Sequence, residues 1–567
     1  MAEYRLFVDI QTIQSLRFGD RGIPRFATEV SRALLAAHAP VAAIALNPLL
    51  PWPRRIHPDL AAAPQLTWNT GPALRRARAG GPVATFVISP FEGARPAHGV
   101  LAAHTADVPQ MVMVHDLIPE VVGRHDPASD WGRMYARRRQ WAGEADVVIC
   151  PSEHTRRDVI ERWAVAPEQV AVIGEAASPF FCAPGPEENA ATLLRAVLPA
   201  INRPFVLCVS GWDTYKNTET LIEAWSELDG AVRREHQLVI ACTLPAEGRE
   251  AWRELARRRG IGDDEIVLTG FVEDEVLRAL YRAAALFVLP SHYEGFGLPV
   301  LEAVNCGATA ITSDASSLPE IIEWPAATFP PNDTGAVADR VEQALSDSAF
   351  RAELAGVCRR AAERHTWRRV VDRLLAARTL LPDPATARPH RLRIALVGAL
   401  APPAPASAAA IARLGEQLAP QCDVDCFAEP DPARPVGRVG TSRRYRILPA
   451  RSLGVSFSPA AYDAVVYAIT ATPHDETARL ARTYPGVVWL PDDELPASGP
   501  MTDLASAAHG IIVGSEATRS RLGAVAAGTP TWIAADGHVA PTVREIAVTD
   551  LGPTRPGEAA PVSATTA

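Results

Sequence analysis

Short apolar runs alternate with longer stretches of helical periodicity along most of the chain. In the first part, the apolar runs are residues 6–10, 84–89, 110–114, 147–150 and 170–173. The pattern resumes at residues 205–210, 237–241, 265–269, 285–289 and 309–312, and a later run begins at 393–397. Such alternation is typical of α/β proteins with a parallel sheet covered by helices on both faces. We therefore predict doubly wound, Rossmann-like domains.

Two stretches break this pattern, residues 183–199 and 381–389, and we interpret both as linkers. The predicted domains are then 1–185, 200–382 and 391–550, followed by a tail at 551–567 whose Pro-, Ala-, Thr- and Ser-rich composition predicts disorder. Ligands of doubly wound domains bind at the carboxyl ends of the strands. We expect the ligand in a cleft between the first two domains.

The third predicted domain repeats motifs of the first. Residues 147–158 match residues 511–521, and residues 112–120 match residues 487–495 in the same order. One such match could arise by chance, but two in the same order indicate an internal duplication.

Residues 291–303 carry the most informative pattern. A predicted buried strand leads into Gly295 and Gly297, and Pro299 then begins an apolar helical stretch that Gly307 can end. A glycine-rich turn at a helix start offers free backbone N–H groups and the positive end of the helix dipole. The segment therefore predicts a phosphate-binding turn.

Two carboxylates bracket this turn. Glu294 precedes it, and Glu302 stands eight positions later, which the pattern places in the first turn of the helix. Acidic residues near a helix start are common because they complement the dipole. A carboxylate beside a diphosphate is nevertheless repelled unless it accepts hydrogen bonds, which the hydroxyls of a nucleotide sugar supply. The segment thus indicates a ligand that carries both phosphate and several hydroxyl groups.

Three further elements follow predicted strands. His115 and Asp116 end one strand, Lys216 follows another, and residues 17–26 form a loop whose Pro24 can occupy the first helical position. Taken alone, a His-Asp pair is more often structural than catalytic, and a lysine after a strand is usually solvated.

In combination, these elements resemble the retaining glycosyltransferases of family 4 (group 1), which have the GT-B fold of two Rossmann-like domains. The spacing of Glu294 and Glu302 is similar to the Glu-x7-Glu donor signature of that family, and residues 115–119 resemble its His-Asp-Leu-Ile-Pro element. The resemblance covers residues 1–380 and, more weakly, 391–550.

The resemblance implies a role for each matching residue. The histidine lies beside the transferred sugar, the lysine neutralises the leaving nucleoside diphosphate, and the two glutamates bond the sugar and the ribose. The implied residues are His115 and Glu294 at the catalytic position; Lys216, Asn217, Gly211, Phe271, Val272, Gly295, Phe296, Gly297, Leu298 and Glu302 for donor binding; Gly22 and Arg25 near the phosphates; and Asp116 and Ser152 on the acceptor side.

The chain departs from the family at several positions. Pro24 replaces a glycine of the phosphate loop, and Tyr215 stands where arginine is usual. The third domain has Pro491 in place of the histidine, a Pro- and Ala-rich stretch at 401–410 in place of the loop, and no counterpart of the Glu-x7-Glu half. We expect it to be a degenerate N-terminal-type domain without a catalytic role. Its Asp-x-Asp at 423–425 lies in an apolar strand pattern and is interpreted as structural.

The implied activity is transfer of a hexose, with mannose favoured, from a nucleoside diphosphate sugar to a polysaccharide or lipid-linked acceptor. The resemblance implies neither a metal nor a cofactor. Two alternatives stay open: a non-catalytic sugar-nucleotide-binding or scaffolding protein, and a GT-B sugar-nucleotide epimerase.

Composition restricts the partners and the compartment. A formal net charge of −9 argues against nucleic acid as a partner. Arginine clusters at 75–78 and 137–139 are interpreted as solvated helix faces, with an anionic lipid surface as the alternative. The eight cysteines form no Cys-x-x-Cys pair, and no signal peptide or membrane span is recognisable. We therefore expect a cytoplasmic protein, with peripheral contact at the inner membrane face as the alternative. No pattern predicts the oligomeric state.

Overall fold

The computed structural model describes most of the first 384 residues and shorter segments of the rest. The described residues are 3–15, 22–47, 52–67, 70–91, 108–123, 126, 129–181, 190–384, 392–398, 405–428, 446–450, 453, 462, 464–469, 475–483, 486–490, 508, 510–513, 515–522, 531–534 and 539–548. By its internal contacts the chain divides into two compact units. Unit 1 comprises residues 1–20, 40–111 and 381–567, and unit 2 comprises residues 21–39 and 112–380. The limits of the three predicted domains remain a prediction, and the predicted tail lies outside the described residues.

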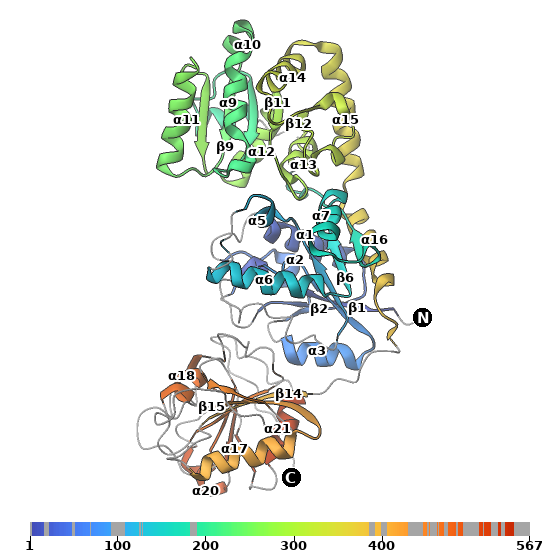
Figure 1. The fold of residues 1–567 in the computed structure, drawn as a ribbon, viewed down its shortest axis with the longest axis vertical. Helices are drawn as coiled ribbons and strands as arrows, with labels where there is room; N and C mark the ends of the chain where they lie inside the picture. Colours follow the sequence, from blue (N-terminus) through green and yellow to red (C-terminus); the bar gives the residue numbers. More distant parts are fainter. Residues whose placement is uncertain are drawn as a thin grey trace. The chain divides into compact units, whose positions relative to one another are not determined.

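The strands form three sheets whose pairings are parallel, as the alternating pattern predicts (Figure 1). The first sheet has the order β3-β2-β1-β4-β5-β6-β7, and the division between the units falls within β5. Its strands are β1 (Arg5–Asp9), β2 (Val41–Ala45), β3 (Leu66–Thr67), β4 (Val83–Val87), β5 (Gln110–Met113), β6 (Val147–Cys150) and β7 (Val170–Val172). The apolar runs predicted five of these strands, each to within two residues, and missed β2 and β3.

The second sheet lies in unit 2 and has the order β10-β9-β8-β11-β12-β13. Its strands are β8 (Phe205–Val209), β9 (Gln237–Ala241), β10 (Ile266–Gly270), β11 (Leu286–Leu289), β12 (Ala310–Ser313) and β13 (Thr328–Phe329). The third sheet lies in unit 1 and has the order β16-β15-β14-β17-β18-β19-β20. Its strands are β14 (Leu392–Gly398), β15 (Cys422–Ala428), β16 (Arg446–Pro449), β17 (Ala464–Ala468), β18 (Val487–Trp489), β19 (Gly510–Val513) and β20 (Thr531–Ile533).

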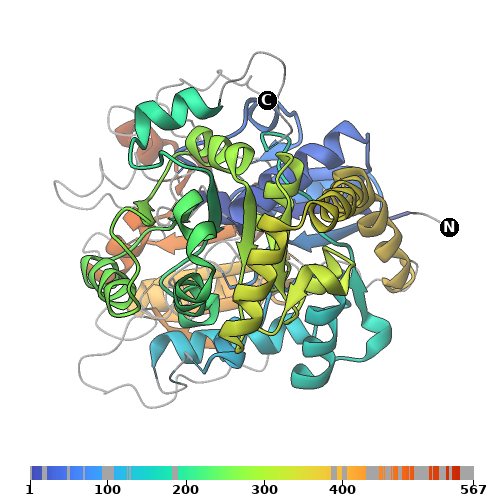
Figure 2. The ribbon, with the colours of Figure 1, turned by 90° about the horizontal axis from the view of Figure 1, so that it is seen from above.

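Helices connect successive strands, and around the second sheet they lie on both faces (Figures 1 and 2). Those of unit 2 are α1 (Ile23–Ala36), α5 (Ile118–Val121), α6 (Asp130–Gly143), α7 (Glu153–Trp163), α8 (Ala190–Val197), α9 (Thr218–Glu227), α10 (Gly230–Glu235), α11 (Ala246–Arg258), α12 (Asp274–Ala283), α13 (Leu298–Asn305), α14 (Thr334–Ser346), α15 (Ser348–Arg364) and α16 (Trp367–Ala377). The predicted linker at 183–199 thus contains a helix, α8. Those of unit 1 are α2 (Pro58–Ala61), α3 (Thr70–Ala79), α17 (Pro405–Leu418), α18 (Asp475–Thr483), α20 (Glu516–Leu522) and α21 (Val539–Val548).

Each sheet is built on buried apolar side chains. One core cluster of residues 177–358 packs around the second sheet, with Trp225, Tyr281 and Phe287 among its largest fully buried members. Two further clusters, drawn only from residues 394–543, pack around the third sheet. Burial of this extent supplies the main stabilisation of a doubly wound domain, at about 25 cal/mol per Å² of apolar surface.

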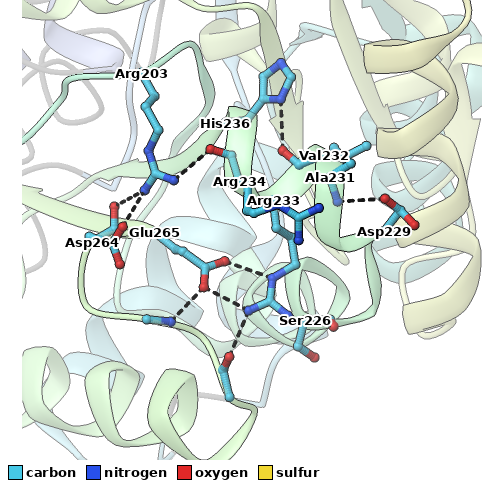
Figure 3. A network of polar contacts seen from close by, with 12 residues as sticks. Arg203, Ser226, Asp229, Ala231, Val232, Arg233, Arg234, His236, Asp264 and Glu265 are labelled. Atoms are coloured by element: carbon cyan, nitrogen blue, oxygen red, sulfur yellow. Dashed lines mark hydrogen bonds and ion pairs between the residues drawn. The ribbon is translucent and has the colours of Figure 1, made fainter.

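A network of charged side chains lies at the amino end of β9 and β10 (Figure 3). The Arg233 guanidinium donates to both oxygens of Glu265, at 2.8 and 3.0 Å, and to the carbonyl of Gly260 at 2.8 Å. Arg203 donates to the backbone carbonyl and the carboxylate of Asp264. Since these residues precede their strands, the network lies at the edge opposite to that where ligands of parallel sheets bind, and we assign it a structural role.

Candidate active site

The segment after β11 forms a tight loop that leads into α13. Gly297 is the N-cap residue, with φ +116° and ψ 44°, and Pro299 occupies the second helical position. A Cβ at Gly297 would approach Leu318 Cδ2 to 2.7 Å, so both the backbone conformation and the packing require glycine. At the other end, Gly307 has φ +94°, and the N–H groups of Gly307 and Ala308 donate to Val304 and Ala303, as in a Schellman motif.

One detail of the sequence prediction is wrong. Glu302 lies in the second turn of α13, because the helix begins at Leu298 and its first turn contains no acidic residue. The sequence pattern placed the helix start at Pro299, one residue too late, because it does not distinguish the N-cap from its apolar neighbours. Glu302 therefore interacts little with the helix dipole, and specific partners hold it instead.

Glu294 and Lys216 form a buried ion pair beside this turn. The ammonium donates to both carboxylate oxygens, at 2.7 and 3.0 Å, and the Ser291 hydroxyl donates to Oε1 at 2.7 Å. Burial disfavours the charged lysine, but the Glu294 carboxylate outweighs it and raises the pKa of Lys216 above its ordinary value. The backbone N–H of Glu294 donates to Ser316, which has φ +54°. The carboxylate and its cation are therefore fixed in place before any ligand binds.

Lys216 is the only lysine in the 567-residue chain, whose other basic residues, His aside, are all arginine. Where a solvated charge is sufficient, the sequence uses arginine, so a single lysine at this position indicates a need for a compact point charge. Its ammonium also lies 5.2 Å from the centre of the Tyr215 ring. The tyrosine that replaces the family's usual arginine thus makes a cation–π contact with the lysine beside it.

Glu302 is held on both of its oxygens. Arg25 of α1 donates to Oε1 at 2.8 Å, and the buried Tyr281 hydroxyl donates to Oε2 at 3.0 Å. The second terminal nitrogen of Arg25 binds both oxygens of Asp274, at 2.8 and 2.9 Å. Burial raises the pKa of Glu302, and the arginine opposes that rise. Arg25, predicted to approach the donor phosphates, therefore contacts the predicted ribose-binding glutamate in this structure.

Gly295 packs directly against the strand end that carries His115. A Cβ at this glycine would lie 2.0 Å from the carbonyl oxygen of His115, which only glycine avoids. Its own carbonyl accepts from the hydroxyls of Ser152, at 2.7 Å, and Thr155, at 3.0 Å. Ser152 is also the N-cap of α7, where its oxygen accepts from the Thr155 N–H at 3.0 Å. Ser152, predicted for the acceptor side, is thus buried and bonded to the signature loop.

His115 and Asp116 follow β5 and point to different partners. Nδ1 of His115 lies 3.2 Å from Glu175 Oε1, and the ring meets Phe26 edge-on at 5.2 Å. Asp116 accepts from the N–H of Ile118 at 2.9 Å, and burial raises the pKa of its carboxyl.

The other predicted site residues have different surroundings. The Asn217 amide donates to the carbonyls of Pro290 and Pro331 and accepts from Thr220, so its side chain holds the loops together. Gly211 lies close to the Lys216 side chain, Gly22 is the N-cap of α1, and Leu298 is the first residue of α13. Phe271 is 56% exposed after β10, Val272 is half-buried, and Phe296 is buried.

Sequence reasoning missed several residues that hold this site. Glu175 contacts His115, Tyr281 contacts Glu302, and the Ser317 hydroxyl lies 2.9 Å from the carbonyl of Glu294. Glu320 accepts from the N–H groups of residues 153 and 154 at the start of α7. No local pattern distinguishes Glu175 or Tyr281 from other residues after a strand or within a helix.

Within the described ranges, no cluster of three or more His, Cys, Asp and Glu side chains is placed to hold a metal ion. Likewise, none of the described helices is both long and apolar enough to cross a membrane.

Two family models match the chain. The Glycosyltransferase Family 4 model matches residues 21–176, and the model of glycosyl transferases group 1 matches residues 203–347. The first match carries His115, Ser152 and Glu175, and the second carries Lys216, Glu294 and Glu302. The two matches thus cover the two halves from which the site is built.

Characterised relatives from Escherichia coli agree with these models. The serotype-specific mannosyltransferase WbdA is 32% identical over 277 residues, which is 48% of this chain and 34% of that protein. The O-antigen chain mannosyltransferase B is 30% identical over 207 residues, 36% of this chain and 53% of its own length. The matches therefore span about a third to a half of these relatives. Among solved structures, sucrose-phosphate synthase from Thermosynechococcus elongatus is 22% identical with a TM-score of 0.48, over 65% of this chain and 97% of that one.

Parallel sheets with helices on both faces and the two matched halves define a glycosyltransferase with the GT-B fold. The chain resembles the family 4 glycosyltransferases and, among them, mannosyltransferases.

Proposed function

We propose that the chain transfers a hexose, with retention and without a metal, from a nucleoside diphosphate sugar to a polysaccharide or lipid-linked acceptor. The observation that carries the proposal is the buried pair of Lys216 and Glu294 at the start of α13. Glycosyl transfer builds positive charge on the anomeric carbon and negative charge on the departing diphosphate. A fixed cation beside a helix N-terminus is suited to the anion.

Lys216 would turn from Glu294 toward the diphosphate or share its three N–H groups between them. Glu294 would then accept hydrogen bonds from donor-sugar hydroxyls, since the Ser291 hydroxyl keeps it in place when the lysine moves. The N–H groups of Gly297 and Leu298 would hold the leaving oxygens, because the first N–H groups of a helix have no partner within it.

Mannose is proposed as the sugar because both E. coli relatives are named as mannosyltransferases, and a polysaccharide acceptor because one is named for the O-antigen chain. Contact with the inner membrane face, a cytoplasmic location and the absence of a metal remain part of this proposal.

A non-catalytic sugar-nucleotide-binding protein is the second candidate. Arg25 supports this candidate, because its ion pair with Glu302 occupies the carboxylate that is predicted to bind the ribose. The epimerase alternative is disfavoured by the paired glutamates, Glu294 and Glu302, together with Lys216.

A panel of sugar nucleotides tests the proposal through transfer to mannose oligosaccharides and through slow donor hydrolysis. We expect one donor to be turned over, with Lys216→Ala and Glu294→Ala each lowering transfer by more than about 1000-fold. Lys216→Arg should also lose most activity, because a planar guanidinium cannot reproduce the point charge.

Because Lys216 is the only lysine, reductive ¹³C-methylation labels just this side chain and the terminal amine, and the lysine signal should shift when a nucleoside diphosphate is added. Arg203→Ala, which removes a cation at the opposite edge of the sheet, is the control and should retain transfer. Near-normal activity in Glu294→Ala would overturn the assignment, and a signal shift without turnover of any donor would favour the non-catalytic candidate.

A further inference from the structure

Glu175 is a buried carboxylate whose hydrogen bond goes to His115. It follows β7 and Gly174, which has φ +78°, and its side chain is 5% exposed. Oε1 lies 3.2 Å from His115 Nδ1, and the structure shows no other hydrogen bond for this carboxylate within the described residues. An ionised carboxylate at this depth needs a donor, so the contact is favourable only if Nδ1 carries the proton.

The ring of His115 is held from a second side. Phe26 meets it edge-on, with an interplanar angle of 81°, and Trp367 packs on Phe26 at 5.6 Å. The Trp367 indole in turn donates to the carbonyl of Ala177, two residues after Glu175, at 2.9 Å. The segment that carries the carboxylate and the aromatic rings that orient the histidine are therefore tied together.

A neutral histidine with its proton on Nδ1 presents a lone pair on Nε2. We propose that Glu175 is a positioning residue that fixes His115 in this tautomer, so that Nε2 accepts a hydrogen bond from a hydroxyl of the transferred sugar. This inference rests on the proposed function and refines it. The inference restricts the donor to sugars that carry a hydroxyl group within reach of Nε2. Through His115, the Glu175 carboxylate would then help to select the sugar.

The tautomer is read directly by ¹⁵N NMR of protein labelled at histidine. The wild-type full chain should show the Nδ1–H pattern for His115, assigned by its loss in His115→Ala. Glu175→Ala should convert that signal to a mixture of tautomers. A wild-type signal with a proton on Nε2, whether alone or together with one on Nδ1, overturns the proposal.

Two substitutions separate positioning from simple packing. Glu175→Ala should lower kcat for transfer by about 10- to 100-fold, the usual cost of losing a residue that orients a functional histidine. Glu175→Gln is nearly isosteric, but its neutral amide can donate to Nδ1 as well as accept from it, so the preference for one tautomer is lost. It should therefore lose activity as the alanine variant does, whereas a packing role predicts that glutamine is nearly neutral.

Glu29 supplies the matched control. It is also a buried glutamate of this region, but it accepts from Ser178 at 2.6 Å and from Arg32 at 2.7 Å. Glu29→Gln should leave kcat and the His115 signal unchanged.

Nucleoside diphosphate affinity, followed by the methylated Lys216 signal, should change less than about twofold in the Glu175 variants, since the carboxylate is assigned to the sugar and not to the diphosphate. Loss of nucleotide binding together with activity in Glu175→Gln would contradict the inference. Failure of the wild-type protein to transfer any sugar would instead contradict the proposed function, and the NMR result would still decide whether Glu175 sets the tautomer.

Discussion

The turn between β6 and α7 and its repeat between β19 and α20 have the same local structure. In the first, Ser152 Oγ accepts from the N–H of Thr155 at 3.0 Å; in the second, Ser515 Oγ accepts from the N–H of Thr518 at 3.2 Å. In each pair the two hydroxyl oxygens lie close together, at 3.1 and 3.2 Å. The first and third sheets also have corresponding strand orders. These parallels support the internal duplication.

The first turn also binds a segment that lies far away in the chain. Ser152 and Thr155 both donate to the carbonyl of Gly295, and Glu320 accepts from the amides at the start of α7. A serine N-cap is therefore a property of the local sequence, whereas its use in a site depends on a partner segment far away in the chain.

The largest expected effect tests that partner segment. Gly295→Ala should abolish transfer, by more than about 1000-fold, because the new Cβ would lie 2.0 Å from the His115 carbonyl and would push the signature loop away from Ser152. A transfer assay measures the loss. Gly335→Ala in α14 is the control, since its Cβ would meet no atom closer than 3.5 Å, and it should keep full activity. Normal transfer in Gly295→Ala would show that the close approach is not needed.

A buried aspartate in each repeat gives the next contrast. Asp425 of β15 accepts from the Tyr462 hydroxyl at 2.7 Å. Asp9 of β1 accepts from the Gln11 N–H on one oxygen and, among the described residues, has no hydrogen-bond partner on the other. Burial raises the pKa of Asp9 to about 7. The folded pKa exceeds the unfolded one, so the stability present below about pH 4 is lost as pH rises toward 7, by up to about 4 kcal/mol.

Asp9→Asn should remove this pH-dependent loss of stability, because the amide does not ionise. Hydrogen–deuterium exchange of peptides that contain β1 should be slower in the variant than in the wild type at pH 8 and similar at about pH 3.5, below the unfolded pKa of the carboxyl. Asp425→Asn should leave exchange of β15 nearly unchanged, because an amide oxygen can still accept from Tyr462. Faster exchange of β1 in Asp9→Asn at pH 8 would mean that the ionised carboxylate stabilises the fold.

The sequence predicted most of the fold because buried parallel strands appear as continuous apolar runs. Strand β9 was placed without error, but β3 and β13 span only two residues and are too short to show a period. The sequence predicted those site residues that belong to motifs in the family's order, such as His115, Lys216 and Glu294. Glu175 could not be predicted, because its contact with His115 joins two strand ends that lie 60 residues apart.

The paired serines provide a moderate effect. Ser152→Ala and Ser515→Ala should each destabilise their helix start by about 1 kcal/mol, the usual cost of losing a serine N-cap. Only Ser152→Ala should also lower transfer, by about tenfold, because its hydroxyl holds the Gly295 carbonyl at 2.7 Å. Parallel transfer assays and exchange of α7 and α20 separate the two effects. Equal losses of activity in both variants would show that the repeat takes part in the reaction.

The smallest effect is expected from removal of the whole third sheet. Both of its core clusters are drawn from residues 394–543 alone, and the core around the second sheet uses residues 177–358. Side chains that do not share a core contribute almost independently, so a chain that ends at residue 385 should hydrolyse its donor within about threefold of the full-length rate. Tyr4, whose hydroxyl donates to the carbonyl of Pro382, keeps its partner in that chain. If a soluble, folded truncated protein hydrolyses no donor, the third sheet supports the site despite lacking its residues.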